Sequence, residues 1–253
     1  MCLIVVAHQV HPSYPLLLAA NRDEFRQRPT QRMHHWQQPK MLAGKDLQAG
    51  GTWLGVGIDG RWAALTNYRD GRNKSAGGPS RGHICTDFIK QSLSALEFAK
   101  QLSQQSYAGF NVLLWDGEHL VYYGSQNKQT PQRLKPGIYG LSNAHLDTDW
   151  PKVNTVKAGM TALLGEQQVT HQHLQSIMRD KQLAAAQLLP DTGIPLAWEQ
   201  RLSACFIDAP EMDYGTRTCI SLLQNLQGQL HIKERDFDLS ESPDQDFSFS
   251  FTP

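Results

Sequence analysis

The sequence lacks a long apolar run and an excess of charge of either sign. Its longest apolar stretches, LIVVA and PLLLAA near the start, are far shorter than the roughly 20 residues that cross a bilayer. Basic and acidic side chains balance at 24 each, so no net field draws nucleic acid or an anionic membrane to the chain. We therefore expect no integral membrane segment and no nucleic-acid partner.

The sequence also has few cysteines and no cysteines or histidines spaced as metal ligands. It holds four cysteines, which form no CxxC pair, and its ten histidines have neither zinc nor haem-attachment spacing. The start lacks the basic region and cleavage site of a secretory signal. These absences predict a cytoplasmic protein with reduced thiols, no disulfide scaffold and no metal site.

Signals for hairpins and for helices alternate along the whole chain. Asp59-Gly60 and Asp116-Gly117 each separate two apolar strands, which is a strong hairpin signal. Ser94 and Glu97 match a capping box before a helical stretch, and residues 171–189 have helical composition. Hairpins in separate blocks with helices between them favour an α+β fold. We predict one domain over residues 1–253, a four-layer αββα sandwich.

The residue with the most distinctive chemistry is Cys2, at the start of the apolar run CLIVVA. Removal of Met1 would place a thiol and an α-amine on the same residue. Those groups titrate near about 8.5 and about 8, so a proton passes between them at little cost near neutral pH. Cys2 is therefore either a buried thiol in a strand or a nucleophile whose own amine is the base.

A polar cluster, NRDEF at residues 21–25, directly follows the apolar run LLLAA. Donors and acceptors gathered at a strand end are typical of a site, whereas a surface turn is the alternative interpretation. Asp23 or Glu24 would orient the amine of Cys2.

Three further polar residues stand next to predicted strands. Asn67 and Asn143 each follow a strand, where an amide N–H suits the stabilisation of an oxyanion. Asparagine is also common in ordinary turns. Arg217 enters a strand near two acidic residues, which equally fits a structural ion pair.

Together these pieces resemble one family across nearly the whole chain. The matching stretches are, in order, MCLI, LLLAANRDEF, GGTWLGV, AALTNYRD, YYG, GIYGLSNAHLDTDWPK and YGTRTCISLL. In this order and spacing they resemble the NRDE family, also called the transport and Golgi organisation protein 2 family. That family is similar to cysteine N-terminal-nucleophile hydrolases such as bile salt hydrolase and penicillin V acylase, which have the αββα sandwich.

The resemblance implies roles for individual residues. Cys2 matches the nucleophile of those hydrolases, and Asn21 and Asp23 match two positions of their Arg-Asn-x-Asp pattern, in which the Asp contacts the cysteine amine. The Arg of that pattern falls on Ala20 here, which departs from the hydrolases. The catalytic residues that the resemblance implies are Cys2, Asp23, Asn67, Asn143 and Arg217.

The resemblance also implies an activity, the handling of haem inside the cell. We favour a carrier that binds haem as cargo and exchanges it with donor and acceptor proteins, with no catalytic cofactor. The alternative is an amidohydrolase that acts on an N-acyl or amide metabolite through Cys2. Arginines would pair with the haem propionates, and aromatic walls would hold the macrocycle. The residues assigned to a haem site are Asn21, Arg22, Glu24, Trp53, Tyr68 and Arg69, with Trp62 either a wall or ordinary core.

Overall fold

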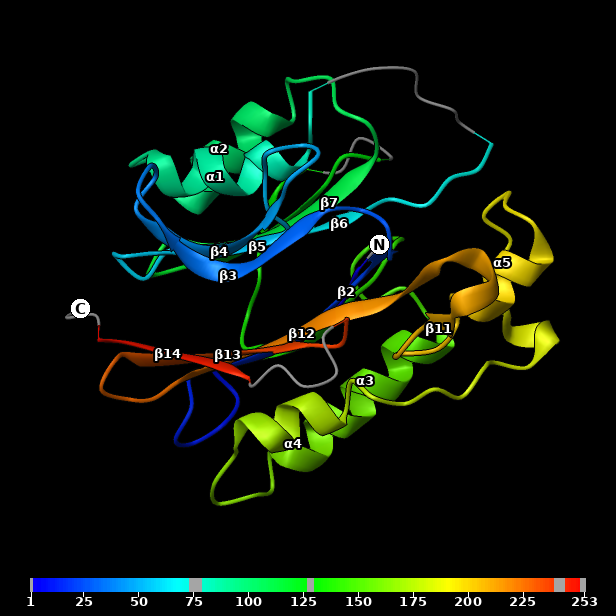
Figure 1. Ribbon diagram of the computed structural model, residues 1–253. Helices are drawn as coiled ribbons and strands as arrows, with labels where there is room; N and C mark the ends of the chain where they lie inside the picture. The colour runs from blue at the N-terminus through cyan, green and yellow to red at the C-terminus, as the bar shows by residue number, and fades with distance from the viewer. Residues whose placement is uncertain (1, 73–78, 127–129, 239–243, 251–253) are drawn as a thin grey trace.

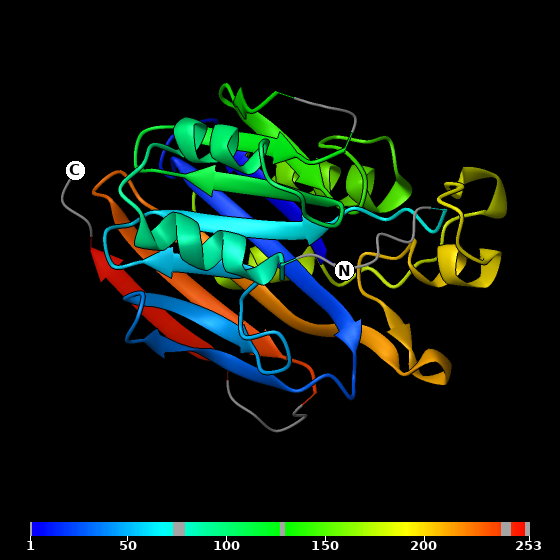
Figure 2. The ribbon, with the colours of Figure 1, turned by 90° about the horizontal axis from the view of Figure 1, so that it is seen from above.

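Two antiparallel sheets pack face to face, and helices cover the outer side of each (Figure 1). The computed structural model describes residues 2–72, 79–126, 130–238 and 244–250. Within these ranges the two sheets, called sheet A and sheet B, have seven strands each. Seen from above, their strands cross at an angle (Figure 2). The four-layer αββα sandwich predicted from the sequence is confirmed.

The strands are distributed between the sheets as follows. Sheet A contains, in spatial order, β10 (Gly137–Leu141), β1 (Cys2–His8), β2 (Leu16–Phe25), β12 (Tyr214–Gln224), β13 (Gln229–Asp236) and β14 (Gln245–Ser250), with β11 (Asp208–Ala209) paired to β12. Sheet B contains β3 (Thr30–Trp36), β4 (Met41–Asp46), β5 (Leu54–Gly57), β6 (Trp62–Asn67), β7 (Phe110–Trp115), β8 (Leu120–Gly124) and β9 (Gln132–Arg133).

The helices form the two outer layers and one lateral lobe. They are α1 (Gly82–Lys90), α2 (Ala95–Leu102), α3 (Pro151–Leu163), α4 (His171–Ser176) and α5 (Leu196–Arg201), with 3₁₀ turns η1 (Ala186–Leu188) and η2 (Pro210–Met212). α1 and α2 cover sheet B, and α3 and α4 cover sheet A (Figure 1). α5 lies to one side of this stack.

Three apolar cores separate the four layers. Alternate residues of a strand point to opposite faces, so Leu16 and Leu18 of β2 enter the core between the sheets, whereas Leu17 packs toward α3 and α4. The third core lies between sheet B and the helices α1 and α2. Trp62 is fully buried between the sheets, so it is ordinary core. Because sheet A is covered on both sides, its central strands carry continuous apolar runs, LIVVA in β1 and LLLAA in β2.

Short sequence signals correctly predict the local structure at several points. The hairpins at Asp59-Gly60 and Asp116-Gly117 form as β5–β6 and β7–β8. Their glycines have φ of 84° and 101°, values that residues with a side chain rarely adopt. The capping box forms at α2, where the Ser94 hydroxyl accepts a hydrogen bond from the Glu97 N–H at 3.3 Å.

The helix predicted over residues 171–189 is much shorter in the structure, because α4 has only 6 residues. Beyond it, the Met178 carbonyl accepts a hydrogen bond from Asn21 Nδ2 at 2.9 Å. The Asp180 carbonyl accepts one from the Phe206 N–H at 2.8 Å. Partners from distant strands and loops therefore satisfy backbone groups that a longer helix would have paired internally.

The polar tetrad forms the last part of a strand, as the strand-end interpretation predicts, and not a surface turn. β2 continues through Phe25, so neighbouring residues of the tetrad face opposite sides of sheet A. Asn21 donates to carbonyl groups on the side of the outer helices. Arg22 instead stacks on Trp53 of the segment that leads into sheet B. The strand thus divides the tetrad between two environments.

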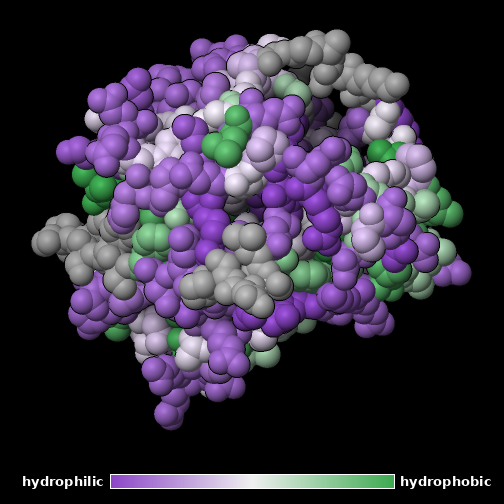
Figure 3. Space-filling model, viewed as in Figure 1, coloured by the Kyte–Doolittle hydropathy of each residue, from purple (hydrophilic) through white to green (hydrophobic). Residues whose placement is uncertain are grey.

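The outer surface offers no broad apolar face in the view of Figure 3, where hydrophilic residues predominate and apolar ones form small separate patches. No helix in the described part of the chain is long and apolar enough to span a membrane.

Candidate active site

Cys2 and Arg22 are direct neighbours in the ladder between β1 and β2. Both side chains are almost fully buried, with 7% and 4% of their surface exposed. Cys2 belongs to the core between the sheets. The Arg22 guanidinium lies 4.4 Å from the ring centre of Trp53, and its Nη2 atom lies 3.6 Å from Asp46 Oδ2. A thiol and a cation therefore share one face at the edge of the inter-sheet space.

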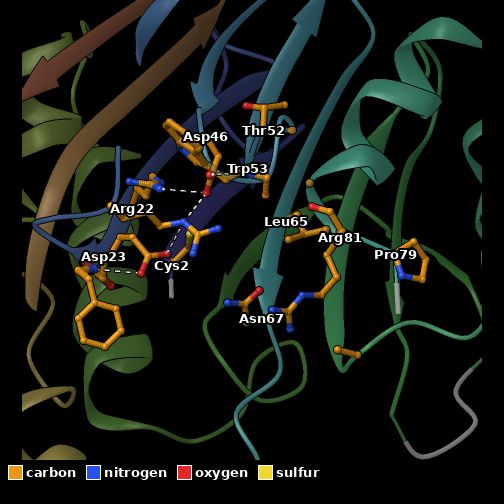
Figure 4. A pocket seen from close by; sticks show the side chains of 18 residues that line it. Cys2, Arg22, Asp23, Asp46, Thr52, Trp53, Leu65, Asn67, Pro79 and Arg81 are labelled. Atoms are coloured by element: carbon orange, nitrogen blue, oxygen red, sulfur yellow. Dashed lines mark hydrogen bonds and ion pairs between the residues drawn. The ribbon is translucent and has the colours of Figure 1, made fainter. Parts of the chain in front are cut away.

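These two residues open onto a pocket of about 550 Å³ (Figure 4). Its walls come from both sheets and from the start of α1. Sheet A contributes Cys2, Arg22, Asp23, Glu24 and Phe25, sheet B and its connections contribute Asp46, Thr52, Trp53, Leu65 and Asn67, and the α1 end contributes Ser80, Arg81 and Gly82. The volume lies within the range of small-molecule sites.

Asp23 is fully buried at the wall of this pocket. Its Oδ1 accepts a hydrogen bond from the Thr216 hydroxyl at 2.6 Å, and its main-chain carbonyl accepts one from the Tyr214 hydroxyl at 2.8 Å. Burial raises the pKa of the Asp23 carboxyl, and the charge of Lys152 is the largest influence that opposes this. One neighbouring strand, β12, thus holds both the carboxyl and the main chain of Asp23 in place.

Lys152 is the most unusual charged residue near the site. It stands in the first turn of α3, only 3% of it is exposed, and its Nζ has no hydrogen-bond partner among the described residues. Burial, then the nearby charge of Arg69, lowers its pKa to about 8. The positive end of a helix dipole also disfavours a cation there. Such a combination is typical of functional sites.

The Cys2 thiol needs help to ionise in this environment. Burial raises its pKa, while the positive charge of Arg22 acts in the opposite direction. A thiol whose pKa is raised holds its proton at neutral pH, and the thiolate is the nucleophilic form. A base close to Cys2 is therefore required for any covalent chemistry.

The ends of β6 and β10 are tied to each other and to Cys2. Asn143 Nδ2 donates to the Asn67 carbonyl at 2.9 Å, and the Ser142 hydroxyl donates to the Cys2 carbonyl at 3.4 Å. Asn67 lines the pocket, whereas Asn143 is fully buried behind it. Asn143 therefore positions the backbone that carries Asn67.

Comparison with known proteins identifies the family. A model of the Transport and Golgi organisation 2 family matches residues 1–239. The chain belongs to this family. It is 34% identical to the bovine Transport and Golgi organization protein 2 homolog, over 93% of this chain and 92% of that protein. The human homolog is 33% identical, and the match covers 99% of both chains.

A solved structure extends the comparison of folds. The N-acylethanolamine-hydrolyzing acid amidase ortholog of Caenorhabditis elegans superposes with a TM-score of 0.50, at 10% identity, over 70% of this chain and 86% of that one. At this identity the similarity concerns the fold alone. This Transport and Golgi organisation 2 family member therefore has an N-terminal-nucleophile-hydrolase-like fold.

The structure brings about half of the sequence-predicted site residues of this family member together. Those that line the pocket are Cys2, Arg22, Asp23, Glu24, Trp53 and Asn67. The others, placed outside the lining, are Asn21, Tyr68, Arg69, Asn143 and Arg217.

Each residue outside the pocket has a structural partner that explains its place. Asn21 donates to two carbonyl groups on the far side of sheet A. Arg69 pairs with Glu199 at 2.9 Å, and the Tyr68 hydroxyl lies 3.4 Å from a ring nitrogen of His145. These contacts keep Arg69 and Tyr68 away from the ligand space that was predicted for them.

Arg217 holds the connection between the sheets rather than facing the pocket. Its Nε is 2.5 Å from Asp238 Oδ2, and its Nη1 donates to the carbonyls of Phe25 and Arg28. It sits where β12 has an irregular register against β2, a β-bulge that turns a side chain out of the regular alternation.

Sequence reasoning missed four charged residues of the site. Arg28, Asp46 and Arg81 line the pocket, and Lys152 lies behind it. Lys152 ends the matching stretch GIYGLSNAHLDTDWPK, whereas Arg81 stands outside every matching stretch, and neither shows a pattern that distinguishes it from a surface residue. Only the fold reveals that they are close to Cys2.

Proposed function

We propose that this protein is a cytoplasmic amidohydrolase in which Cys2, made N-terminal by removal of Met1, attacks a linear amide. The observation that carries the proposal is the Cys2 thiol at the wall of a pocket shared with Arg22, Asp23 and Asn67. A nucleophile, a buried carboxylate and an amide donor are the parts that acyl transfer needs.

The position of Arg22 supports this proposal. The hydrolases that the family resembles carry their arginine at the position of Ala20, and side chains two apart on a strand face the same way. Ala20 belongs to the core between the sheets, the side on which Arg22 stacks against Trp53. An arginine moved by two residues therefore still reaches the space beside Cys2.

The chemistry balances with residues of this chain and water. The α-amine of Cys2 takes the thiol proton, and the thiolate adds to the amide carbonyl carbon. The Asn67 amide would stabilise the resulting oxyanion. The C–N bond then breaks, and the amine leaves with the proton held by the α-amine. Water adds to the thioester, the C–S bond breaks, and the acid is released with the thiol restored.

Trapping of the acyl-enzyme tests the proposal. On acid quenching during turnover of an N-acyl amide, we expect mass spectrometry to find a chain without Met1 and an acyl group on the peptide that begins with Cys2. Asp23→Asn keeps the thiol but loses the carboxylate that would hold the amine, so its adduct should form about 100-fold more slowly. A chain that retains Met1 and stays unacylated would contradict the proposal.

Reversible carriage of haem is the second candidate function. One observation favours it: Arg22 stacks at 4.4 Å on Trp53 in a pocket of about 550 Å³ that also holds a thiol. The arginine would pair with a propionate, and Cys2 would serve as a ligand of haem iron once the iron displaces its proton to give the thiolate. Haem would pass through this pocket between donor and acceptor proteins.

A haem titration followed by Soret absorbance checks the carrier hypothesis. We expect saturation near micromolar concentration, about −8 kcal/mol, and weaker binding by Arg22→Ala than by the wild type. Arg133→Ala, which changes an exposed arginine outside the pocket lining, should bind as the wild type does. Saturation like that of an unrelated protein would remove this candidate.

A further inference from the structure

Arg22 is a buried cation that its protein neighbours leave incompletely satisfied. Its Nη1 atom is buried and has no hydrogen-bond partner in the described part of the chain. Its Nη2 atom is 3.6 Å from Asp46 Oδ2, beyond hydrogen-bond distance, and the same oxygen accepts from Arg28 Nε at 2.6 Å. A buried donor without an acceptor costs about 1 to 3 kcal/mol, and more when it is charged.

Arg81 is a second cation that lines the same pocket, and most of its hydrogen-bond donors have no partner among the described residues. Its Nη1 donates to the Gly109 carbonyl at 2.9 Å, and within the described ranges it forms no ion pair. It immediately precedes α1, a helix of 9 residues with no acidic residue in its first turn and no side-chain cap. The positive end of the helix dipole therefore adds to the charge of Arg81.

The acidic residues of the pocket have other partners. Asp46 accepts from Arg28, and Glu24 lies 3.8 Å from Arg28 while accepting the Phe25 N–H at 2.9 Å. Asp23 is held by Thr216. Asp46 pairs with Arg22 only at 3.6 Å, and among the described residues no acidic side chain accepts a hydrogen bond from Arg22 Nη1 or from Arg81.

We propose that Arg22 and Arg81 form a carboxylate subsite, so that the amide substrate of this pocket carries a carboxylate close to the bond that Cys2 attacks. Arginine pairs with a carboxylate through two parallel hydrogen bonds. Cys2 and Arg22 are opposite each other in an antiparallel pair, where side chains lie about 5 Å apart at Cβ. The carboxylate is therefore only a few bonds from the scissile carbonyl, as in an N-acyl amino acid.

This inference rests on the proposed function only for the place of the reacting bond, and binding can be measured without turnover. The probes are N-decanoylglycine and N-decanoylglycinamide, which differ only in the carboxylate. In the Cys2→Ala background, calorimetry should give a dissociation constant at least about 10-fold lower for the acid. Arg81→Gln should lose most of that preference, whereas Arg133→Gln should keep it.

Several outcomes would overturn the subsite. These are equal affinity for the two probes, absence of binding by both, or a preference that survives Arg81→Gln. Arg22→Gln is the second variant; if it melts at a much lower temperature than the wild type, the half-buried Arg81 decides the question alone. A wild-type protein that prefers the acid but releases no glycine would disprove the amidohydrolase and leave the subsite standing. A protein that hydrolyses both probes equally would disprove only the subsite.

Discussion

Cys2→Ala is expected to abolish amide hydrolysis, with a loss of at least about 1,000-fold in turnover, because removal of the nucleophile ends covalent catalysis. Cys2 sits at the start of β1 with 7% of its surface exposed, so its replacement by alanine removes one sulfur atom and leaves the backbone ladder intact. The free energy of unfolding should change by no more than about 1 kcal/mol. Product release and urea unfolding of the same preparations measure the two effects.

Cys219→Ala is the matched control for this experiment. Cys219 is also buried, with 1% exposed, but it belongs to the core beneath the outer helices and not to the pocket. It should therefore cost similar stability and leave turnover unchanged. Turnover near the wild-type level in Cys2→Ala would rule out the nucleophile and with it the proposed enzyme.

Lys152→Met is expected to stabilise the fold by about 1 to 3 kcal/mol at pH 7. The pKa of Lys152 is lowered from 10.5 to about 8 in the folded state, mainly by burial, and each pKa unit corresponds to about 1.4 kcal/mol. Below pH 8 the lysine is charged in both states, so the folded protein bears the full penalty. Between about pH 8 and 10.5 the folded state binds fewer protons, so wild-type stability should rise with pH in that window.

The variant should show no such rise, because methionine fills the same space without a charge. Urea unfolding at pH 7, 8.5 and 10 distinguishes the two behaviours. Lys157→Met is the control: Lys157 lies in the same helix but is partly exposed and pairs with Asp147 at 2.6 Å. It should destabilise by less than about 1 kcal/mol. Destabilisation by Lys152→Met would show that its amine is well solvated or paired.

Stabilisation together with lost activity would mark Lys152 as a residue kept for function. Lys152 is the largest influence that lowers the pKa of Asp23, so its removal should leave that carboxyl protonated more often. A protonated Asp23 holds the α-amine of Cys2 less well, so hydrolysis should need a higher pH in Lys152→Met. Proteins commonly lose stability at positions that their activity requires.

The parts of the fold that were predicted correctly depend on neighbouring residues in the sequence. Asp59-Gly60 and Asp116-Gly117 specify hairpins, and Ser94 with Glu97 specifies the start of a helix, whatever the rest of the chain does. The wrongly extended helix at residues 171–189 shows the limit, because the groups that end it, such as Asn21, are distant in sequence.

The candidate site, like the fold, was predictable from the sequence only where the signal is local. Cys2 stands out at the start of one apolar run, and the tetrad stands out after another. How far β2 continues decides which of the tetrad's side chains meet the pocket. Continuation of β2 through Phe25 sends Arg22 toward Cys2 and Asn21 away from it. Arg81 and Lys152 come from other layers of the sandwich, so no local pattern places them there.

The short crossing from β2 to β3 has a consequence for ligand selectivity. Residues 26–29 carry the chain from one sheet to the other, and Arg217 grips this crossing through the carbonyls of Phe25 and Arg28. This crossing joins the two sheets, and the pocket lies between the sheets next to it, since Phe25 and Arg28 are among its lining residues. Substitutions in residues 26–29 would alter the separation of the two sheets at the pocket. They would thereby change which ligand lengths fit, while Cys2, Asp23 and Asn67 stay in place.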